Sequence, residues 1–575
     1  MRSIRINPLV LSVLLLPVSS GRAAVYSVAA VGDDSNIGSE AAPWQTIQHA
    51  ANTMVAGDSV LVQSGTYDER VSTVRGGTME TDRIAFQADG AVTIRGFFVN
   101  HPFVTLDGFD ITGHSAPSTT TGYVLAGGGG DYFQMLNNTV RDGIHIVRTN
   151  MVFSGNTVFT ATGGFLAAGF QAGQTIWIGR GSSGAIVNSG GQVIDSVTDD
   201  TLTVTGAFVD EGPVAAYVTG SNAYGLVIVG GADNCVVRGN TFSNLSYDAW
   251  FVGGASNLFE NNTIAASQGW DVMHFMGTDS VFRGNFIHSG DLVVYQNSPD
   301  VFENWPTIPY RNILFESNFV HGFVGVLASQ KGTLGNMDTL TFRNNVFVDV
   351  GRFLPRNPNT TFENNSFLYV AASSSPVNGP APHPLKFEDY NVENAVIRNN
   401  VFVACGQLDR FPEVHGWYEF ESPPTNYLAS HNFVAGPPPG FEAKTGFDEG
   451  LPDLNGGDPG FVNIDDPLGP DGIPFTEDDG LRLLPDSKLR GAGYGGVDLG
   501  AYMTAVELPA LSVALQLDGR LRIAWPVSAD GFELQSAPAA TGDWSDVITE
   551  PVLEANMNVV TADATDGGRF YRLAR

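Results

Sequence analysis

The sequence reads VRGNTF at residues 237–242, FENNTI at residues 259–264 and FRNNVF at residues 342–347. In each stretch an asparagine separates two short runs that contain apolar residues. Equivalent asparagines recur along the chain at Asn138, Asn240, Asn262, Asn285, Asn318, Asn345, Asn365, Asn400 and Asn432. The intervals 240 to 262, 262 to 285 and 345 to 365 are 22, 23 and 20 residues long. A repeat of this length predicts a solenoid whose coils stack on one another.

Each predicted coil has room for three short strands joined by turns. Asparagine tolerates left-handed backbone geometry, so we expect it to form the same corner in every coil. Equivalent asparagines would then stack as an internal ladder. The longer intervals, 285–318 and 365–400, predict loops of about ten residues that protrude from one face, where binding sites commonly lie.

The composition agrees with a long, turn-rich chain that consists mainly of strands. Of the 575 residues, 43% are hydrophobic and 11% aromatic, which is enough to build a core. The 68 glycines and 31 prolines indicate many turns and few long helices. A chain of this length exceeds one compact core, so we expect a solenoid with appendages.

The first 23 residues have the layout of a secretory signal peptide. Arg2 and Arg5 precede an apolar stretch at residues 9–18, and small residues follow it around Ala23. No later stretch is long and apolar enough to span a bilayer. We therefore expect a secreted, soluble protein that acts as a monomer.

The net charge of −31 argues against nucleic acids and anionic membranes as partners. Lysine is rare, so an anionic substrate would need local cationic side chains or a bridging metal ion. The two cysteines, Cys235 and Cys405, lie several predicted coils apart. We expect them to be separate buried thiols rather than a disulfide.

Two groups of motifs flank the repeats. The first group comprises Pro43-Trp44, Thr46-Ile47, Gly57-Asp58, Val60, Val62, Gly65-Thr66-Tyr67 and Glu69. Within it we predict a short helix that begins at Pro43 and ends before Gly57. The second comprises Asp458-Pro459-Gly460-Phe461, Leu481-Arg482-Leu483, Gly491-Ala492-Gly493 and Asp498-Leu499-Gly500-Ala501-Tyr502. Over residues 25 to 504 the chain thereby resembles the pectate-lyase-like right-handed β-helix proteins. The resemblance implies a right-handed parallel β-helix, in a superfamily that contains lyases, hydrolases, epimerases and non-enzymes.

The pattern divides the chain into four parts. We predict a signal peptide at residues 1–23 and an all-β right-handed parallel β-helix with an amino-terminal cap helix at residues 24–504. Between about residues 157 and 221 the coil pattern disappears, which predicts an inserted small β module. Alternating apolar residues at residues 505–575 predict a small β-sandwich-like domain.

Aligning the coils on their asparagines brings three aspartates into one row. Asp248 and Asp271 each lie 14 residues before the next repeat asparagine, and Asp300 lies 18 before it. Neighbouring strands are about 4.8 Å apart, so these carboxylates would repel one another unless a cation or a proton relieves them. A row that only caps turns is the alternative interpretation.

Further reactive and aromatic side chains fall near this row. Three residues after each aspartate come Phe251, His274 and Glu303, which would stack in the same way. Lys331 and Arg352 follow in the next coils. Aromatic residues that suit sugar stacking surround the row, namely Trp250, Trp270, Trp305, Tyr295 and Tyr310.

The leading functional hypothesis is a carbohydrate-active enzyme that depolymerises an acidic, uronate-containing polysaccharide by β-elimination. In such a reaction stacked aspartates hold Ca²⁺, which binds the uronate carboxylate and acidifies the proton at C5, while a base removes that proton. The resemblance to calcium-dependent pectate lyases implies that Asp248, Asp271 and Asp300 are the ligands and that Lys331 is the base.

Two other functions remain open on the same scaffold. A glycoside hydrolase would use Asp271 with Asp300 or Glu303 as its carboxylate pair, with His274 tuning the acid. A non-catalytic surface protein would use the aromatic face only to bind glycans.

A second acidic cluster lies near the end of the solenoid, around Gly472. No lysine or arginine occurs between Lys444 and Arg482. Residues with side-chain oxygen atoms occur at intervals along the loop, and Gly472 lies at the expected bend. We predict a structural Ca²⁺ held by Asp465, Asp471 and Asp478. The alternative is a solvated acidic loop.

Overall fold

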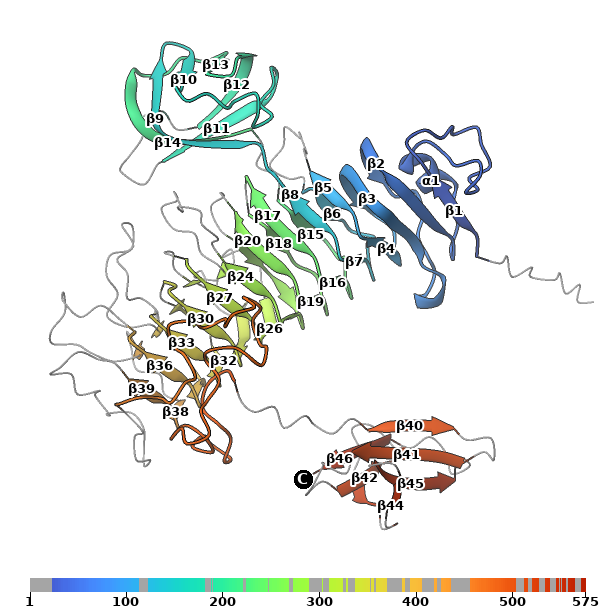
Figure 1. Ribbon diagram of the computed structural model, residues 1–575, viewed down its shortest axis with the longest axis vertical. Coiled ribbons are helices and arrows are strands. Elements are labelled where there is room, and N and C mark those ends of the chain that lie inside the picture. The colour runs from blue at the N-terminus through green and yellow to red at the C-terminus, as the bar shows by residue number, and fades with distance from the viewer. Residues whose placement is uncertain are drawn as a thin grey trace, which may run out of the picture. The chain divides into compact units, whose positions relative to one another are not determined.

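Figure 1 shows the computed structural model of the chain. It describes residues 23–112, 122–180, 188, 190–220, 224–246, 248–267, 272–288, 302–303, 310–323, 327–328, 337–351, 353–355, 358–369, 385–387, 393–405, 418–420, 426–435, 456–502, 511–515, 520–526, 533–537, 544–547, 549, 551–554, 557–563 and 570–574. The chain forms two compact units, Met1–Ala501 and Tyr502–Arg575. The predicted signal peptide lies outside the described residues, except for Ala23.

The first unit is a parallel β-helix with three strands in each coil. Strand β15 (Leu226–Ile228) pairs with β18 (Trp250–Val252), β16 (Val236–Arg238) with β19 (Leu258–Glu260), and β17 (Thr241–Leu245) with β20 (Thr263–Ser267). Each strand therefore lies beside the equivalent strand of the next coil, and all three pairings are parallel. The repeats at residues 237–242 and 259–264 predict these coils correctly.

Three columns of strands run along the β-helix (Figure 1). The first column consists of β6 (Val124–Ala126), β15, β18, β21 (Met273–Phe275) and β25 (Phe302–Glu303), with a separate sheet of β28 (Leu327–Ala328), β31 (Phe353–Leu354), β34 (Leu385–Phe387) and β37 (Tyr418–Phe420). The second consists of β4 (Val104–Asp107), β7 (Gln134–Leu136), β16, β19, β22 (Gly277–Thr278), β23 (Val281–Arg283), β26 (Tyr310–Glu316), β29 (Met337–Arg343), β32 (Thr360–Glu363), β35 (Ala395–Arg398) and β38 (Tyr427–Ser430). The third consists of β5 (Asp110–Thr112), β8 (Thr139–Arg141), β17, β20, β24 (Phe286–His288), β27 (Phe319–His321), β30 (Val346–Val348), β33 (Ser366–Leu368), β36 (Val401–Val403) and β39 (Phe433–Ala435).

The repeat asparagines form the predicted internal ladder between the second and third columns. In each coil the side-chain Nδ2 donates to Oδ1 of the equivalent asparagine in the next coil, for example from Asn262 to Asn285 at 3.0 Å and from Asn285 to Asn318 at 2.9 Å. The same Nδ2 also donates to a main-chain oxygen, such as that of Phe259. The ladder therefore satisfies polar groups that are almost completely buried.

The corner itself is made differently from our prediction. The residue just before each ladder asparagine, not the asparagine itself, has the left-handed conformation. Its φ is 54° at Asn261, 68° at Gly239 and 64° at Gly284. Glycine and asparagine, which adopt positive φ at low cost, occupy this position in most coils, and Ser317 and His431 occupy it in the other two. The side chain of the ladder asparagine can therefore point inward and form hydrogen bonds with the equivalent asparagines of the adjacent coils.

Stacked aromatic rings fill the interior beside the ladder. Phe259, Phe282, Phe315, Phe342 and Phe362 occupy equivalent positions in consecutive coils, and their ring centroids are 4.5 to 5.0 Å apart. Each ring buries apolar surface against the ring above and the ring below it. The repeat thus uses the same inward position for an aromatic ring in these five coils and for smaller apolar residues in the coils on either side.

A ladder of alternating charges runs along the outside of the second column. Its members occupy one register position in consecutive strands, and they are Arg238, Glu260, Arg283, Glu316, Arg343, Glu363 and Arg398. Glu260 accepts from Arg238 Nε at 2.7 Å and from Arg283 Nε at 3.0 Å. Burial raises the pKa of Glu260, but the hydrogen bonds from Arg283 and Arg238 outweigh it, so the net pKa is lowered.

Replacing Glu260 with glutamine is expected to lower the free energy of unfolding by about 1 kcal/mol at neutral pH, because its arginine partners are half-exposed. The native carboxyl has a lowered pKa, so its contribution is lost as the pH falls through that pKa. Denaturant unfolding at a series of pH values should therefore show the two proteins converging in acid. Glu40→Gln, at an exposed glutamate outside the ladder, is the control. A difference that persists unchanged in strong acid would contradict this assignment.

Caps close the two ends of the solenoid. Helix α1 (Ile47–Thr53) begins later than the predicted Pro43, because Thr46 is its N-cap and accepts from His49 N at 3.1 Å. Next to it lie β1 (Val25–Val28), β2 (Ser59–Ser72), a 3₁₀ turn (Glu80–Asp82) and β3 (Ile84–Val99). At the other end, residues 456–501 pack against the last coils, where Gly456 N donates to the Val434 oxygen.

The inserted module is a closed six-stranded barrel. It consists of β9 (His145–Ser154), β10 (Thr157–Phe159), β11 (Thr175–Arg180), β12 (Gly190–Val197), β13 (Thr201–Val204) and β14 (Glu211–Thr219). The barrel therefore starts at His145 rather than at about residue 157, because β9 pairs with β10 and β14 instead of continuing a coil.

The second unit contains two small antiparallel sheets, in line with the predicted small β domain. One sheet has β40 (Ser512–Leu515), β41 (Arg520–Pro526), β44 (Val552–Glu554) and β45 (Met557–Asp563), and the other has β42 (Glu533–Ala537), β43 (Ser545–Asp546) and β46 (Phe570–Ala574). Ile523, Trp525, Leu534 and Val560 form its core.

Two further expectations concern cysteines and membrane spans. Cys235 and Cys405 are both free thiols, as predicted, although Cys405 is half-buried rather than buried. Burial raises the pKa of Cys235 to about 12. Within the described part of the chain, no helix is long and apolar enough to cross a membrane.

Candidate functional site

The outer face of the first column carries the residues that the coil alignment singled out. Phe251 on β18 is in register with His274 on β21, and His274 is in register with Glu303 on β25. Their neighbours Trp250, Met273 and Phe275 belong to the hydrophobic core. Because side chains alternate along a strand, Phe251 and His274 point outward, and Glu303 follows them in main-chain register. This is the stacking that the alignment predicts.

Asp248, just before β18, is joined to His274. Its Oδ2 lies 2.9 Å from His274 Nδ1. The aspartate side chain is 0% exposed and the histidine side chain 3% exposed. Burying two polar groups this completely is costly unless they are paired, and here they pair with each other. A carboxylate at Nδ1 fixes the orientation of an imidazole ring and directs its proton chemistry to Nε2.

The observed register matches the spacing that underlies the predicted aspartate row. Three neighbouring strands pair at Trp250, Met273 and Phe302. Each of these residues comes two positions after one of the three aspartates. Asp271 and Asp300 themselves lie outside the described residues, as do Lys331, Arg352, Trp270, Trp305 and Tyr295. Glu303 is described for its main chain only. The roles predicted for these residues remain predictions.

Two of the predicted sugar platforms are wrong. Trp250 and Tyr310 are 0% exposed and belong to the core. The Trp250 ring packs against Phe242 and Phe259, with ring centroids 5.5 and 5.3 Å away. Since Phe251 points outward, the preceding residue must point inward, and strand alternation applied to the sequence would have shown this.

An apolar row that sequence reasoning missed continues the site toward the amino terminus. Phe98, Leu125, Val227 and Phe251 occupy one outer register position on consecutive strands. Phe251 also contacts Tyr224, with ring centroids 5.1 Å apart, and His274, with centroids 5.8 Å apart. Phe98, Leu125 and Phe251 are partly exposed, so their side chains could contact the apolar C–H faces of sugar rings, whereas Val227 is buried.

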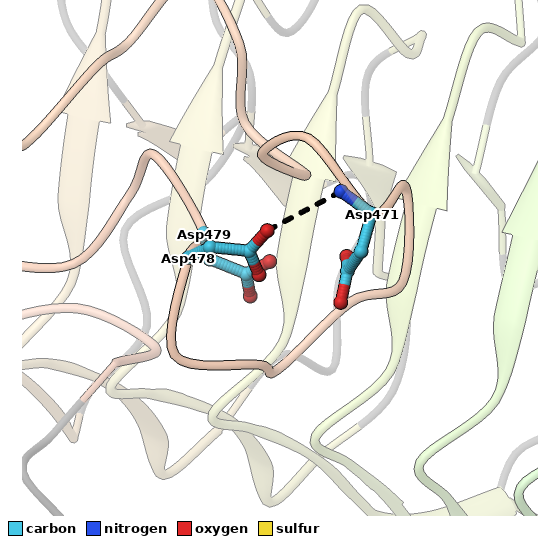
Figure 2. A group of neighbouring side chains, drawn as sticks. All are labelled: Asp471, Asp478 and Asp479. Atoms are coloured by element: carbon cyan, nitrogen blue, oxygen red, sulfur yellow. Dashed lines mark hydrogen bonds between the residues drawn. The ribbon is translucent and has the colours of Figure 1, made fainter.

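The acidic loop brings together two of its three predicted calcium ligands (Figure 2). Carboxylate oxygens of Asp471, Asp478 and Asp479 lie within 4.8 Å of one another. Asp465 is not in this group, because it belongs to the preceding turn, where its amide donates to Asn463. Asp479 takes its place, although it comes directly after Asp478.

Hydrogen bonds hold this acidic group in place. The main-chain amides of Phe475 and Thr476 donate to Asp479 Oδ2 at 2.6 and 3.1 Å. The Thr476 hydroxyl donates to Asp478 Oδ1 at 2.6 Å, and this bond is the main reason that the pKa of Asp478 is lowered. Three aspartate side chains in one loop provide the oxygen ligands that Ca²⁺ prefers.

Comparisons with known proteins agree on the scaffold. Residues 217–367 match the family described as the right handed beta helix region. No curated protein sequence matches the chain. Among solved structures, the chain is similar to pectate lyase Pel9A at 14% identity, covering 84% of this chain and 96% of that one, with a TM-score of 0.42.

Two further solved structures show the same distant likeness. A rhamnogalacturonan lyase matches at 14% identity, over 84% of this chain and 100% of that one, with a TM-score of 0.42. The GH136 lacto-N-biosidase from Eubacterium ramulus matches at 12% identity, over 72% of this chain and 68% of that one, with a TM-score of 0.38. At these identities the likeness concerns the fold alone.

Proposed function

We propose that this right-handed β-helix protein is a secreted, carbohydrate-active enzyme that depolymerises an acidic, uronate-containing polysaccharide by β-elimination. Its active site in this proposal is the outer face of β18, β21 and β25. The observation that carries the proposal is the buried pair of Asp248 and His274, whose Oδ2 and Nδ1 atoms are 2.9 Å apart, with His274 at an outward-facing position of β21.

A purely structural explanation accounts poorly for this pair. Well-packed apolar residues would stabilise the same position as well as or better than a buried acid–base pair. A carboxyl group that is buried against an imidazole nitrogen is also a typical arrangement of catalytic sites, where it holds the ring in one orientation. The apolar row that leads to His274 supports the proposal, since it offers sugar rings a floor beside the reactive group.

In β-elimination a base removes the proton at C5 of the uronate, the electron pair forms the C4–C5 double bond, and the oxygen on C4 leaves with the cleaved chain. We propose His274, held by Asp248, as one carrier of protons in this step. Lys331 is the base that the family resemblance implies. Glu303, at the next position of the row, is suited to protonating the leaving oxygen.

The proposal includes Ca²⁺ at the predicted aspartate row. Asp248 already uses one carboxylate oxygen on His274, so Asp271 and Asp300 would be the principal ligands, with Asp248 beside them. A Ca²⁺ ion held there would neutralise the uronate carboxylate and acidify the proton at C5. It would also offset the large negative charge of the chain against an anionic polymer.

Product absorbance tests the reaction type. The protein is incubated with several uronate polymers, and the ultraviolet absorbance of the unsaturated product is followed with and without a calcium chelator. Absorbance should rise with at least one polymer and stop when the chelator is added. No rise with any of them would refute β-elimination on these substrates.

Hydrolysis is the second candidate, and the position of Glu303 favours it. Glu303 is the residue in register with His274 on the next strand. Paired with Asp271 or Asp300, Glu303 would act as the acid or the base of a glycoside hydrolase. New reducing ends without absorbance would identify this reaction. Binding without either product would instead point to a non-catalytic glycan-binding protein.

The acidic loop gives a separate calcium prediction. Ca²⁺ bound by Asp471, Asp478 and Asp479 should stabilise the folded chain by about 3 kcal/mol at a hundredfold excess over its dissociation constant. We expect a higher melting temperature in Ca²⁺, and loss of most of that increase in Asp478→Asn. Asp465→Asn is the matched control and should respond to Ca²⁺ as the wild type does. Equal responses of all three proteins would rule out a calcium site here.

A further inference from the structure

The inserted barrel is a module with its own hydrophobic core. Fourteen buried residues fill it, and strand pairings close it on every side. They are Ile144, Ile146, Met151, Phe153, Val158, Phe165, Phe170, Ile176, Ile178, Ile194, Leu202, Val204, Ala216 and Val218. Outside this core, neighbouring exposed apolar side chains are candidates for a contact surface, whereas single ones are common on any protein.

Trp177 on β11 is the most notable of these outer side chains. Its neighbours Ile176 and Ile178 point into the core, so Trp177 points outward. It is paired with Gly191 on β12. A Cβ atom at Gly191 would lie 3.3 to 3.4 Å from three atoms of the six-membered indole ring. The ring therefore rests on the glycine main chain.

The other side of the ring remains accessible, since Trp177 is 39% exposed. A large ring that is fixed from below and open above presents a rigid flat surface. Next to it, Val193 is also 39% exposed and is paired with Thr175 on the same side of the sheet. The platform thus combines an aromatic plane, an aliphatic edge and a nearby hydroxyl group.

Charges are few around this platform. Trp177 is in register with Gly191 on one side and Thr219 on the other, neither of which is ionisable. In residues 144–220 the ionised side chains are limited to Asp195, Asp199, Asp200, Asp210, Glu211, Arg148 and Arg180. An aromatic plane without adjacent charge favours an uncharged ligand with an apolar flat face.

We propose that the outer face of β11 is a carbohydrate-binding site that holds a neutral sugar ring flat on Trp177. The C–H face of the ring would stack on the indole, Val193 would contact its edge, and Thr175 would bond a sugar hydroxyl. The site goes beyond the proposed reaction and does not depend on His274. Linked to the active site on one chain, it would hold the enzyme where a neutral polysaccharide accompanies the acidic one.

Affinity electrophoresis of the full-length protein tests this site with four neutral polysaccharides, namely a β-glucan, a mannan, a galactan and a xylan. At least one should retard the wild type. Trp177→Ala should weaken that binding by about tenfold, whereas Trp177→Phe, which keeps an aromatic plane, should retain most of it. Val193→Glu should also weaken binding, because it places a charge at the edge of the platform without removing the ring.

Leu166→Ala is the matched control, since Leu166 is 53% exposed on the same barrel. It should bind as the wild type does. Retardation of the wild type by none of the polymers, or equal binding by Trp177→Ala and Leu166→Ala, would overturn the proposal. A substitution of His274 should leave retardation unchanged, so failure of the proposed reaction and failure of this site are distinguishable.

Discussion

Replacing His274 with glutamine is expected to lower kcat by a factor of about a hundred to ten thousand, the range that positioned acid–base groups contribute. Glutamine is similar in size and can still bond Asp248, so the fold should persist. The measurement is the initial rate of product formation on the most active polymer, with circular dichroism to confirm the fold. A rate within a factor of about three of the wild type would remove His274 from the mechanism.

Two further variants make this result specific. Asp248→Asn should also lower kcat strongly, because an amide no longer fixes the imidazole as the carboxylate does. His321→Gln is the matched control, since His321 lies on the outside of the solenoid in the third column, away from the site. It should retain wild-type activity. Similar losses in His274→Gln and His321→Gln would indicate a general effect on stability instead of catalysis.

Replacing Asn285 with alanine is expected to lower the free energy of unfolding of the β-helix by about 4 kcal/mol or more. Asn285 Oδ1 accepts from both N and Nδ2 of Asn262, and its Nδ2 donates to Asn318 Oδ1 and to the Phe259 oxygen. The substitution leaves several buried polar groups without partners, and each costs about 1–3 kcal/mol. Denaturant unfolding of the full chain measures the loss.

Asn261→Gly is the matched control for the ladder. Asn261 has a φ of 54°, and the equivalent positions in adjacent coils are Gly239 and Gly284. Glycine adopts this conformation readily, so we expect a change of less than about 1 kcal/mol. If Asn285→Ala and Asn261→Gly had equal effects, the inward-pointing asparagine would not be the stabilising element that the structure indicates.

The coils could be predicted from sequence because one buried asparagine recurs at nearly constant spacing. Aligning the coils on this asparagine also predicted correctly that Phe251, His274 and Glu303 are in register. The sequence contains a second repeating feature beside this asparagine. From Asn240 to Asn400, the residue two positions before the ladder asparagine alternates in charge, as in Arg238, Glu260 and Arg283, and these residues form the outer charge ladder.

Other features could not be predicted from the asparagine spacing, because they depend on the direction of side chains or on contacts between coils. Alternation along the strand turns Trp250 inward, although the residue is aromatic and close to the site. The contact between Asp248 and His274 runs diagonally from one coil to the next, whereas the alignment only compared residues at equal positions. The barrel starts at His145 because strand pairing, which no spacing reveals, recruits β9 into it.

The ends of the cleaved chains test the proposed reaction most directly. In one reaction on a uronate polymer, unsaturated ends and new reducing ends are counted for the wild type and for His274→Gln. β-Elimination produces one unsaturated end with each reducing end, so we expect equal numbers from the wild type and almost none from the variant. Reducing ends without unsaturation, or equal activity in both proteins, would contradict β-elimination at the pair of Asp248 and His274.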